Sequence, residues 1–152
     1  MRLTSFTDYT LRVLIFLGAQ GRKGRLTTIG DIAAAYGISE NHLKKVVHHL
    51  ARQGYIETTR GKGGGIRLAR PPREISLGGV IRGAEEDFAL VECLQNSKSN
   101  CSIYGPCRLR TVLAQAMDAF LKTLDAQTLE NLLLPKSELL NAFSVRIALS
   151  RK

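Results

Sequence analysis

The first third of the chain repeats apolar residues at the spacing of α-helices. Three such stretches cover residues 5–19, 29–36 and 39–52. In each stretch the apolar positions recur every three or four residues, which places them on one face of a helix. Gly37 and Ser39 separate the second stretch from the third, and serine is a favoured N-cap. Two helices joined by a short turn that contains glycine predict a helix-turn-helix.

The pattern then changes from helical to alternating. Residues 55–60 and 66–69 are short, partly β-branched runs, and the tip between them, 61–65, is rich in glycine. Pro71 and Pro72 end the second run. This arrangement predicts a β-hairpin wing directly after the helix-turn-helix. The predicted fold is therefore mainly α with a small β-hairpin: a winged helix-turn-helix head.

A long apolar stripe dominates the second half. Ser76 can cap a short helix over 77–86, and a polar stretch precedes the stripe. The stripe is formed by Leu109, Val112, Leu113, Ala116, Phe120, Leu121 and Leu124. A helix with such a stripe needs a partner, which is either a second copy of the chain or the protein's own head. Because two-fold dimers are the commonest oligomers, we predict a long dimerisation helix.

The chain of 152 residues is expected to form one compact unit made of three segments. Residues 1–75 form the DNA-binding head, and residues 76–134 form a cysteine loop with the dimerisation helix. In the second segment, Thr128 or Asp125 can cap a short helix before Pro135. Residues 135–152 are a tail to which the pattern assigns no role.

Charge is distributed unevenly along the chain. Residues 1–75 contain 13 basic and 5 acidic side chains, whereas residues 76–152 contain 9 and 8. A basic excess confined to the head is typical of nucleic-acid binding, although a merely basic surface is the alternative. The predicted DNA contacts lie on the outward side of the third helix and on the hairpin. They are Asn41, His42, Lys44, Lys45, Arg60 and Lys62.

Other classes of protein find little support in the sequence. No stretch approaches the apolar length of a membrane span, and no signal peptide is recognisable, so a cytoplasmic location is expected. No phosphate-binding glycine loop follows residues 61–65, and no Ser/His/Asp constellation stands out. A non-enzymatic role is therefore predicted.

All three cysteines lie in one polar stretch. Cys93, Cys101 and Cys107 are accompanied by Gly105 and Pro106, which favour a loop. An odd number of cysteines in a chain expected in the cytoplasm argues against a disulfide framework. We therefore expect the three thiols to bind a metal or to react with oxidants.

Three chemistries remain open on the residues alone. Structural zinc usually takes four ligands in two close pairs, which these spacings match poorly. A thiol redox sensor is compatible with Arg108 and Arg110 beside Cys107. An iron–sulfur cluster is held mainly by thiolates, and three of them with one weaker ligand leave one iron accessible to small molecules.

The run from Met1 to about Leu134 resembles the winged-helix iron–sulfur repressors, a family that includes cluster-biogenesis regulators and nitric-oxide sensors. The motifs are Met1-Arg-Leu-Thr-Ser-Phe-Thr-Asp8-Tyr9, Tyr36-Gly-Ile-Ser39, Asn41-His42, Arg60-Gly-Lys-Gly-Gly-Gly-Ile-Arg-Leu68, the three cysteines and Cys107-Arg-Leu109. The resemblance implies a homodimer with one iron–sulfur cluster per subunit, with [4Fe-4S] favoured over [2Fe-2S].

The resemblance also implies a fourth ligand. Cluster-biogenesis members supply a histidine three residues after the last cysteine, where this chain has Arg110. Nitric-oxide sensors instead use an N-terminal aspartate of the other subunit, and Asp8 matches that position. From the residues alone, Asp8 is expected to pair with Arg12 one helical turn away. The implied ligand set is Cys93, Cys101, Cys107 and Asp8.

The expected function is that of a nitric-oxide-sensing transcriptional repressor. By resemblance, the dimer binds palindromic operator DNA through residues 39–52 and the wing, and releases it when the cluster is nitrosylated. Two alternatives stay open: an iron–sulfur or redox-status regulator of cluster biogenesis, and a thiol redox-sensing repressor.

Overall fold

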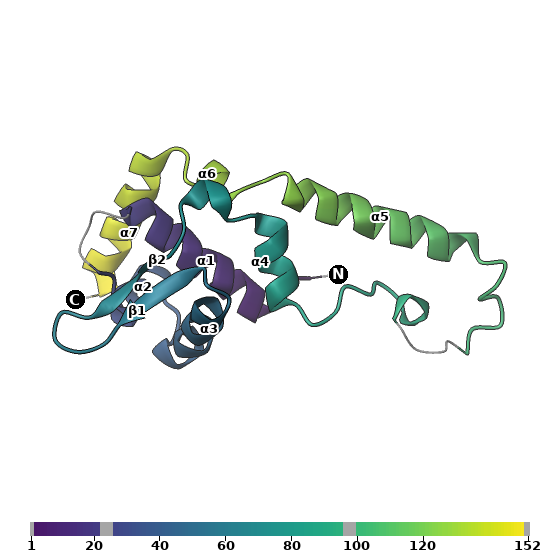
Figure 1. The fold of residues 1–152 in the computed structure, drawn as a ribbon, viewed down its shortest axis with the longest axis horizontal. Helices are drawn as coiled ribbons and strands as arrows, with labels where there is room; N and C mark the ends of the chain where they lie inside the picture. Colours follow the sequence, from purple (N-terminus) through teal and green to yellow (C-terminus); the bar gives the residue numbers. More distant parts are fainter. Residues whose placement is uncertain (1, 22–25, 96–99, 151–152) are drawn as a thin grey trace.

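The computed structural model describes residues 2–21, 26–95 and 100–150 (Figure 1). Its elements are α1 (Ser5–Gln20), α2 (Ile29–Tyr36), α3 (Glu40–Arg52), β1 (Ile56–Thr59), β2 (Gly65–Leu68), η1 (Pro72–Glu74), α4 (Leu77–Ala84), η2 (Glu92–Leu94), α5 (Arg108–Asp125), α6 (Leu129–Leu132) and α7 (Lys136–Ser150). The predicted fold class, mainly α with one small hairpin, is confirmed.

Helix α1 is the centre of the head. It begins after Thr4, whose side chain accepts a hydrogen bond from the backbone N–H of Thr7 at 3.3 Å. Along its length it packs against α3, α4, α6, α7 and β2. Val13 and Leu14 are completely buried as a result. A helix covered from so many directions anchors the elements around it.

The helix-turn-helix forms as the caps predict. Thr28 and Asp31 make a reciprocal capping box at the start of α2. Gly37 ends α2 in the left-handed region at φ 68°, a conformation that glycine adopts without a Cβ penalty. Ser39 caps α3. The buried face of α3 consists of Leu43, Val46, Val47 and Leu50.

The wing is an antiparallel pair of strands. Ile56 pairs with Leu68, and Thr59 pairs with Gly65. The side chain of Ile66 is buried, and its backbone exchanges two hydrogen bonds with Thr27, at 3.1 and 2.7 Å. These bonds join the hairpin to the segment that enters α2, so the wing is held against the helix-turn-helix.

Two sets of contacts connect the start and the end of α4 to the segment around the C-terminal end of α5. Ser76 and Thr128 form an isolated β-bridge. Arg82 donates two hydrogen bonds to the Asp125 carboxylate, at 2.5 and 2.7 Å. Helix α4, which carries Arg82, ends at Ala84, slightly earlier than the predicted limit at 86. These contacts hold the C-terminal end of α5 against α4.

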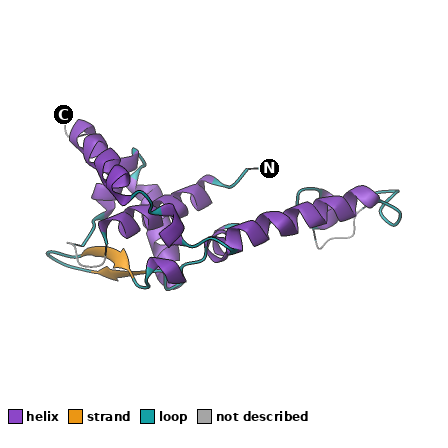
Figure 2. Ribbon diagram, turned by 90° about the horizontal axis from the view of Figure 1, so that it is seen from above, coloured by secondary structure: helices purple, strands orange, loops and turns teal. Residues whose placement is uncertain are grey.

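Helix α5 extends away from the head, as both views show (Figures 1 and 2). None of its residues is buried, and Leu109 and Val112 are 63% and 56% exposed. Within the described ranges, none of the helices is long and apolar enough to cross a membrane. The exposure of Leu109 and Val112 leaves part of the apolar stripe of α5 open to solvent in the single chain.

The C-terminal part folds back onto the head. Leu129 and Leu133 around α6, and Phe143 on α7, are buried in the same core as α1. The Phe143 ring lies 4.9 Å from that of Phe16 and 5.4 Å from that of Tyr36. The tail, which had no predicted role, is thus a helix that covers α1 and α2.

Removing the aromatic contact of α7 should destabilise the head. We expect Phe143→Ala to lower the free energy of unfolding by about 3 kcal/mol, because it leaves a cavity in the core. Val145 on the same helix is 62% exposed, so Val145→Ala should change stability by less than about 0.5 kcal/mol. Denaturant unfolding of both variants tests this, and equal effects would contradict the packing of α7.

Candidate functional site

The six predicted DNA contacts all lie on the surface. Four are on the outward face of α3 and two on the hairpin, whose strand β1 packs against α3. Asn41, His42, Lys44, Lys45, Arg60 and Lys62 are all exposed. Among the described residues, these three lysines and Arg60 take part in no ion pair. One helix face and one hairpin therefore present solvated, uncompensated positive charge.

His42 on α3 also contacts α1. Its ring stacks on that of Tyr9, with centroids 6.1 Å apart and an interplanar angle of 26°. Tyr9 lies in the first turns of α1, next to Asp8. Helix α3 and the start of α1 are thus in direct side-chain contact.

The three cysteines lie in the segment between α4 and α5 (residues 85–107, the cysteine excursion). The described parts of this segment run beside α5 (Figure 1). Cys93 is in η2, which contacts α5, and is half-buried. Cys101 is exposed in a turn, and Cys107 occupies the N-cap position of α5. Within the described residues none of the three cysteines forms a disulfide bond. The backbone N–H groups at the start of a helix carry partial positive charge, which suits an anionic ligand or cluster next to Cys107.

The thiols match an iron–sulfur cluster in kind, but this structure does not bring them together. Three cysteines on one segment are the donor type that such clusters require. Among the residues that the structure describes, however, no three His, Cys, Asp or Glu side chains converge as a metal site. Binding of one cluster by all three thiols would therefore require this segment to rearrange.

Asp8 forms the ion pair that the residues alone predict. Arg12 Nε lies 3.0 Å from its carboxylate, and both side chains are partly exposed. The pair reaches α2, since the Arg12 guanidinium lies 5.6 Å from the centre of the Tyr36 ring. The hydrogen bond to Asp8 raises the pKa of Arg12. Burial raises the pKa of Tyr36 to about 12, while the Arg12 charge opposes this shift.

One contact in the cysteine segment was missed by sequence reasoning. The Arg110 guanidinium lies 4.3 Å from the centre of the Tyr104 ring, a cation–π contact. The backbone N–H of Tyr104 also donates to Cys101 at 3.1 Å. These contacts tie the turn between Cys101 and Cys107 to the first turn of α5. The sequence feature that could have indicated this contact is Tyr104, the single aromatic residue between Cys101 and Cys107.

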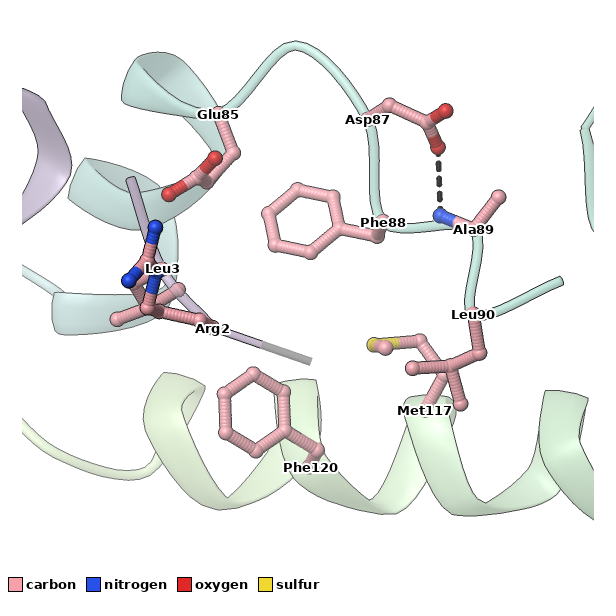
Figure 3. A pocket seen from close by; sticks show the side chains of 9 residues that line it. All are labelled: Arg2, Leu3, Glu85, Asp87, Phe88, Ala89, Leu90, Met117 and Phe120. Atoms are coloured by element: carbon pink, nitrogen blue, oxygen red, sulfur yellow. Dashed lines mark hydrogen bonds between the residues drawn. The ribbon is translucent and has the colours of Figure 1, made fainter. Parts of the chain in front are cut away.

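A cavity of about 350 Å³ opens between the start of the chain, the segment after α4, and α5 (Figure 3). Its lining is Arg2, Leu3, Glu85, Asp87, Phe88, Ala89, Leu90, Met117 and Phe120. Glu85 accepts a hydrogen bond from the Thr4 backbone N–H at 2.7 Å, which ties the start of α1 to the end of α4. None of the predicted site residues lines this cavity.

Residues 3–134 match the model of the Rrf2 family, which is described as an iron-dependent transcriptional regulator. The chain belongs to the Rrf2 family. This match spans the winged head, the cysteine segment and α5, and it leaves α7 outside.

Curated Rrf2-type relatives are similar over nearly their whole length. The HTH-type transcriptional regulator NsrR of Geobacillus kaustophilus is 51% identical over 139 residues, covering 91% of this chain and 94% of the relative. The NsrR of Bacillus subtilis is 47% identical over 146 residues, with 96% and 99% covered. The relatives are DNA-binding transcriptional regulators, a non-enzymatic role.

Solved structures agree on the fold. CymR, the global cysteine regulator of B. subtilis, has a TM-score of 0.71 at 29% identity, covering 87% of this chain and 95% of CymR. The IscR of T. potens has a TM-score of 0.68 at 25% identity, with 88% and 86% covered. The Rrf2 assignment thus rests on both sequence and structure.

The burial of Tyr36 predicts a late phenol titration. The folded pKa, about 12, lies above the usual value near 10, so the neutral phenol favours the folded state. This contribution is complete below about pH 10 and is lost as the pH rises through about 12. Near-ultraviolet absorbance should show a phenolate step near pH 12 that Tyr36→Phe removes. An unchanged step in that variant would contradict the assignment.

Proposed function

We propose that this Rrf2-family chain is a cytoplasmic, homodimeric transcriptional repressor that senses nitric oxide through an iron–sulfur cluster. The observation that carries the proposal is the combination of a basic winged head with three cysteines, none in a disulfide bond among the described residues, on the segment before a projecting helix. About half the residues are identical to those of the NsrR relatives across both parts. Nitric oxide is proposed as the signal because the chain resembles nitric-oxide-sensing repressors.

The head would read a palindromic operator. Residues 39–52, which include α3, would enter the major groove, where its N-terminal residues usually meet base edges. Asn41 and His42 have the donors and acceptors for this contact, and Lys44 and Lys45 can reach guanine edges or phosphates. Arg60 and Lys62 on the wing would lie in the flanking minor groove.

The exposed stripe of α5 supports a two-fold dimer. Leu109 and Val112 remain mostly exposed, and the head covers none of α5 completely. A second copy of the same helix would remove this apolar surface from water, which stabilises association. Pairing along α5 would also place two heads on one DNA, as a palindromic site requires.

The dimer would complete the cluster site. Cys93, Cys101 and Cys107 would hold one cluster per subunit, with [4Fe-4S] favoured over [2Fe-2S], and Asp8 would be the fourth ligand. Within the described residues of a single chain, Asp8 and the thiols do not come together. This separation supports donation of Asp8 by the other subunit. When bound, the cluster supplies an iron that reacts with nitric oxide.

The chain's own residues can carry the state of Asp8 to the DNA-binding surface. Asp8 pairs with Arg12, which lies over Tyr36 of α2. The neighbouring Tyr9 stacks on His42 of α3. A change in the position of Asp8 would therefore act on both helices of the helix-turn-helix. Such coupling changes affinity only as far as the two states bind DNA differently.

The first test is spectroscopic. Anaerobically purified protein should show the visible absorbance of an iron–sulfur cluster, and this absorbance should disappear with stoichiometric nitric oxide. Operator binding, measured on the same samples, should fall in parallel. Cys101→Ala should abolish the cluster, because a site with two thiolates in place of three lacks sufficient ligands.

Other outcomes would identify the alternatives. A colourless protein that binds zinc and ignores nitric oxide would sink the sensor proposal. Cluster loss under iron limitation, with no response to nitric oxide, would indicate a regulator of cluster biogenesis. A colourless protein whose DNA binding responds to thiol oxidants would indicate a thiol redox sensor.

The role of Asp8 can be separated from that of its ion pair. Asp8→Ala should leave some cluster but shorten its lifetime in air, as measured by the decay of visible absorbance. Asp118→Ala is the matched control, since Asp118 also pairs one helical turn away, with Lys122 at 2.7 Å. Equal lifetimes in Asp8→Ala and the wild type would show that Asp8 is no cluster ligand and serves only in the ion pair with Arg12.

A further inference from the structure

Helix α7 is part of the head although the family match ends before it. The match covers residues 3–134, whereas α7 spans Lys136–Ser150. Phe143 is only 7% exposed, and its ring packs between those of Phe16 and Tyr36. Figure 1 shows α7 beside α2, on the opposite side of the head from α5. The first helix of the helix-turn-helix is thus backed by the C-terminal helix.

This packing holds one cation next to the turn of the helix-turn-helix. Arg146 follows Phe143 by one helical turn. A Cβ added to Gly37 would lie 3.2 Å from Nη2 of Arg146, so the guanidinium is against the turn backbone. Gly37 ends α2, and Ser39 caps α3 immediately afterwards. Arg146 is therefore held beside the start of the recognition helix.

Nothing in the described part of the chain neutralises this cation. Arg146 is exposed, and it takes part in none of the ion pairs among the described residues. Arg82 and Arg67, by contrast, each pair with a carboxylate. An arginine that neither pairs nor covers the core has no evident structural role. Its position leaves it available to an external anion.

We propose that Arg146 binds a phosphate of the DNA backbone and that α7 extends the DNA-binding surface beyond the winged head. In helix-turn-helix proteins the start of the recognition helix enters the major groove, and phosphates line both edges of that groove. A cation against the turn before α3 lies where such a phosphate passes. The proposal rests on DNA binding by the head and is independent of the cluster and of nitric oxide.

The contact predicts a specific salt dependence. Each phosphate contact adds about 0.9 to the slope of log affinity against log salt. Because the dimer carries one Arg146 on each of its two heads, Arg146→Gln should lower the slope by about two, so that the wild type loses about tenfold more affinity than the variant between about 50 and 200 mM salt. Fluorescence anisotropy should be run on a duplex selected from random sequence and on one of arbitrary sequence. Both should show the change.

Two further variants separate contact from bulk charge. Arg146→Lys keeps the charge and should retain the wild-type slope. Lys136→Gln removes one charge from the other end of α7, near Gly21, and should leave the slope unchanged. Thermal unfolding should match the wild type in all three variants, because both side chains are exposed.

Four results would overturn the proposal. An unchanged slope in Arg146→Gln would remove the contact. An equal decrease in Lys136→Gln would reduce the effect to net charge, and a decrease in Arg146→Lys as large as in Arg146→Gln would point to a packing role. If the wild type binds neither duplex, the proposal fails together with DNA binding by the head. The nitric-oxide response of the wild type stays a separate measurement.

Discussion

The burial of α1 is the constraint on which the remaining structure depends. Helices from both halves of the chain and one strand of the wing pack on it, and Val13 and Leu14 are excluded from water. Even its buried polar groups are satisfied locally, since Thr10 donates to the Phe6 carbonyl at 2.8 Å. A buried hydroxyl without a partner would cost stability. Because α1 is held on so many sides, residues at its exposed start have defined neighbours.

Those neighbours connect the start of α1 to both helices of the helix-turn-helix. Asp8 and Tyr9 are adjacent in sequence but point to different partners: Arg12 with Tyr36, and His42. One path reaches α2 and the other reaches α3. Both contacts are modest in energy, since exposed ion pairs contribute about 0–1 kcal/mol. Modest contacts suit a device in which a ligand shifts the balance between two states.

Stability is concentrated at one end of the molecule. The buried core lies in the head, whereas α5 has no buried residue and Cys101 is exposed. Among its described residues, the cysteine excursion is held chiefly by the contact of Tyr104 with Arg110 and by the hydrogen bond from Gln95 to the Asp87 carboxylate at 2.8 Å. A segment with few buried contacts opens at low cost. A bound cluster or a second copy of α5 would therefore alter this end more than the head.

Local signals in the sequence determined the helices, the hairpin, the caps at Thr28 and Ser39, and the Asp8–Arg12 pair, because each depends on residues close along the chain. The exposure of the side chains predicted to contact DNA followed from the same periodicity, and the family resemblance followed from motifs. Only the tertiary structure decided that α7 covers α2 and that Arg146 lies beside Gly37. These contacts join residues about a hundred positions apart, and no local periodicity encodes which distant surface an apolar side chain will meet.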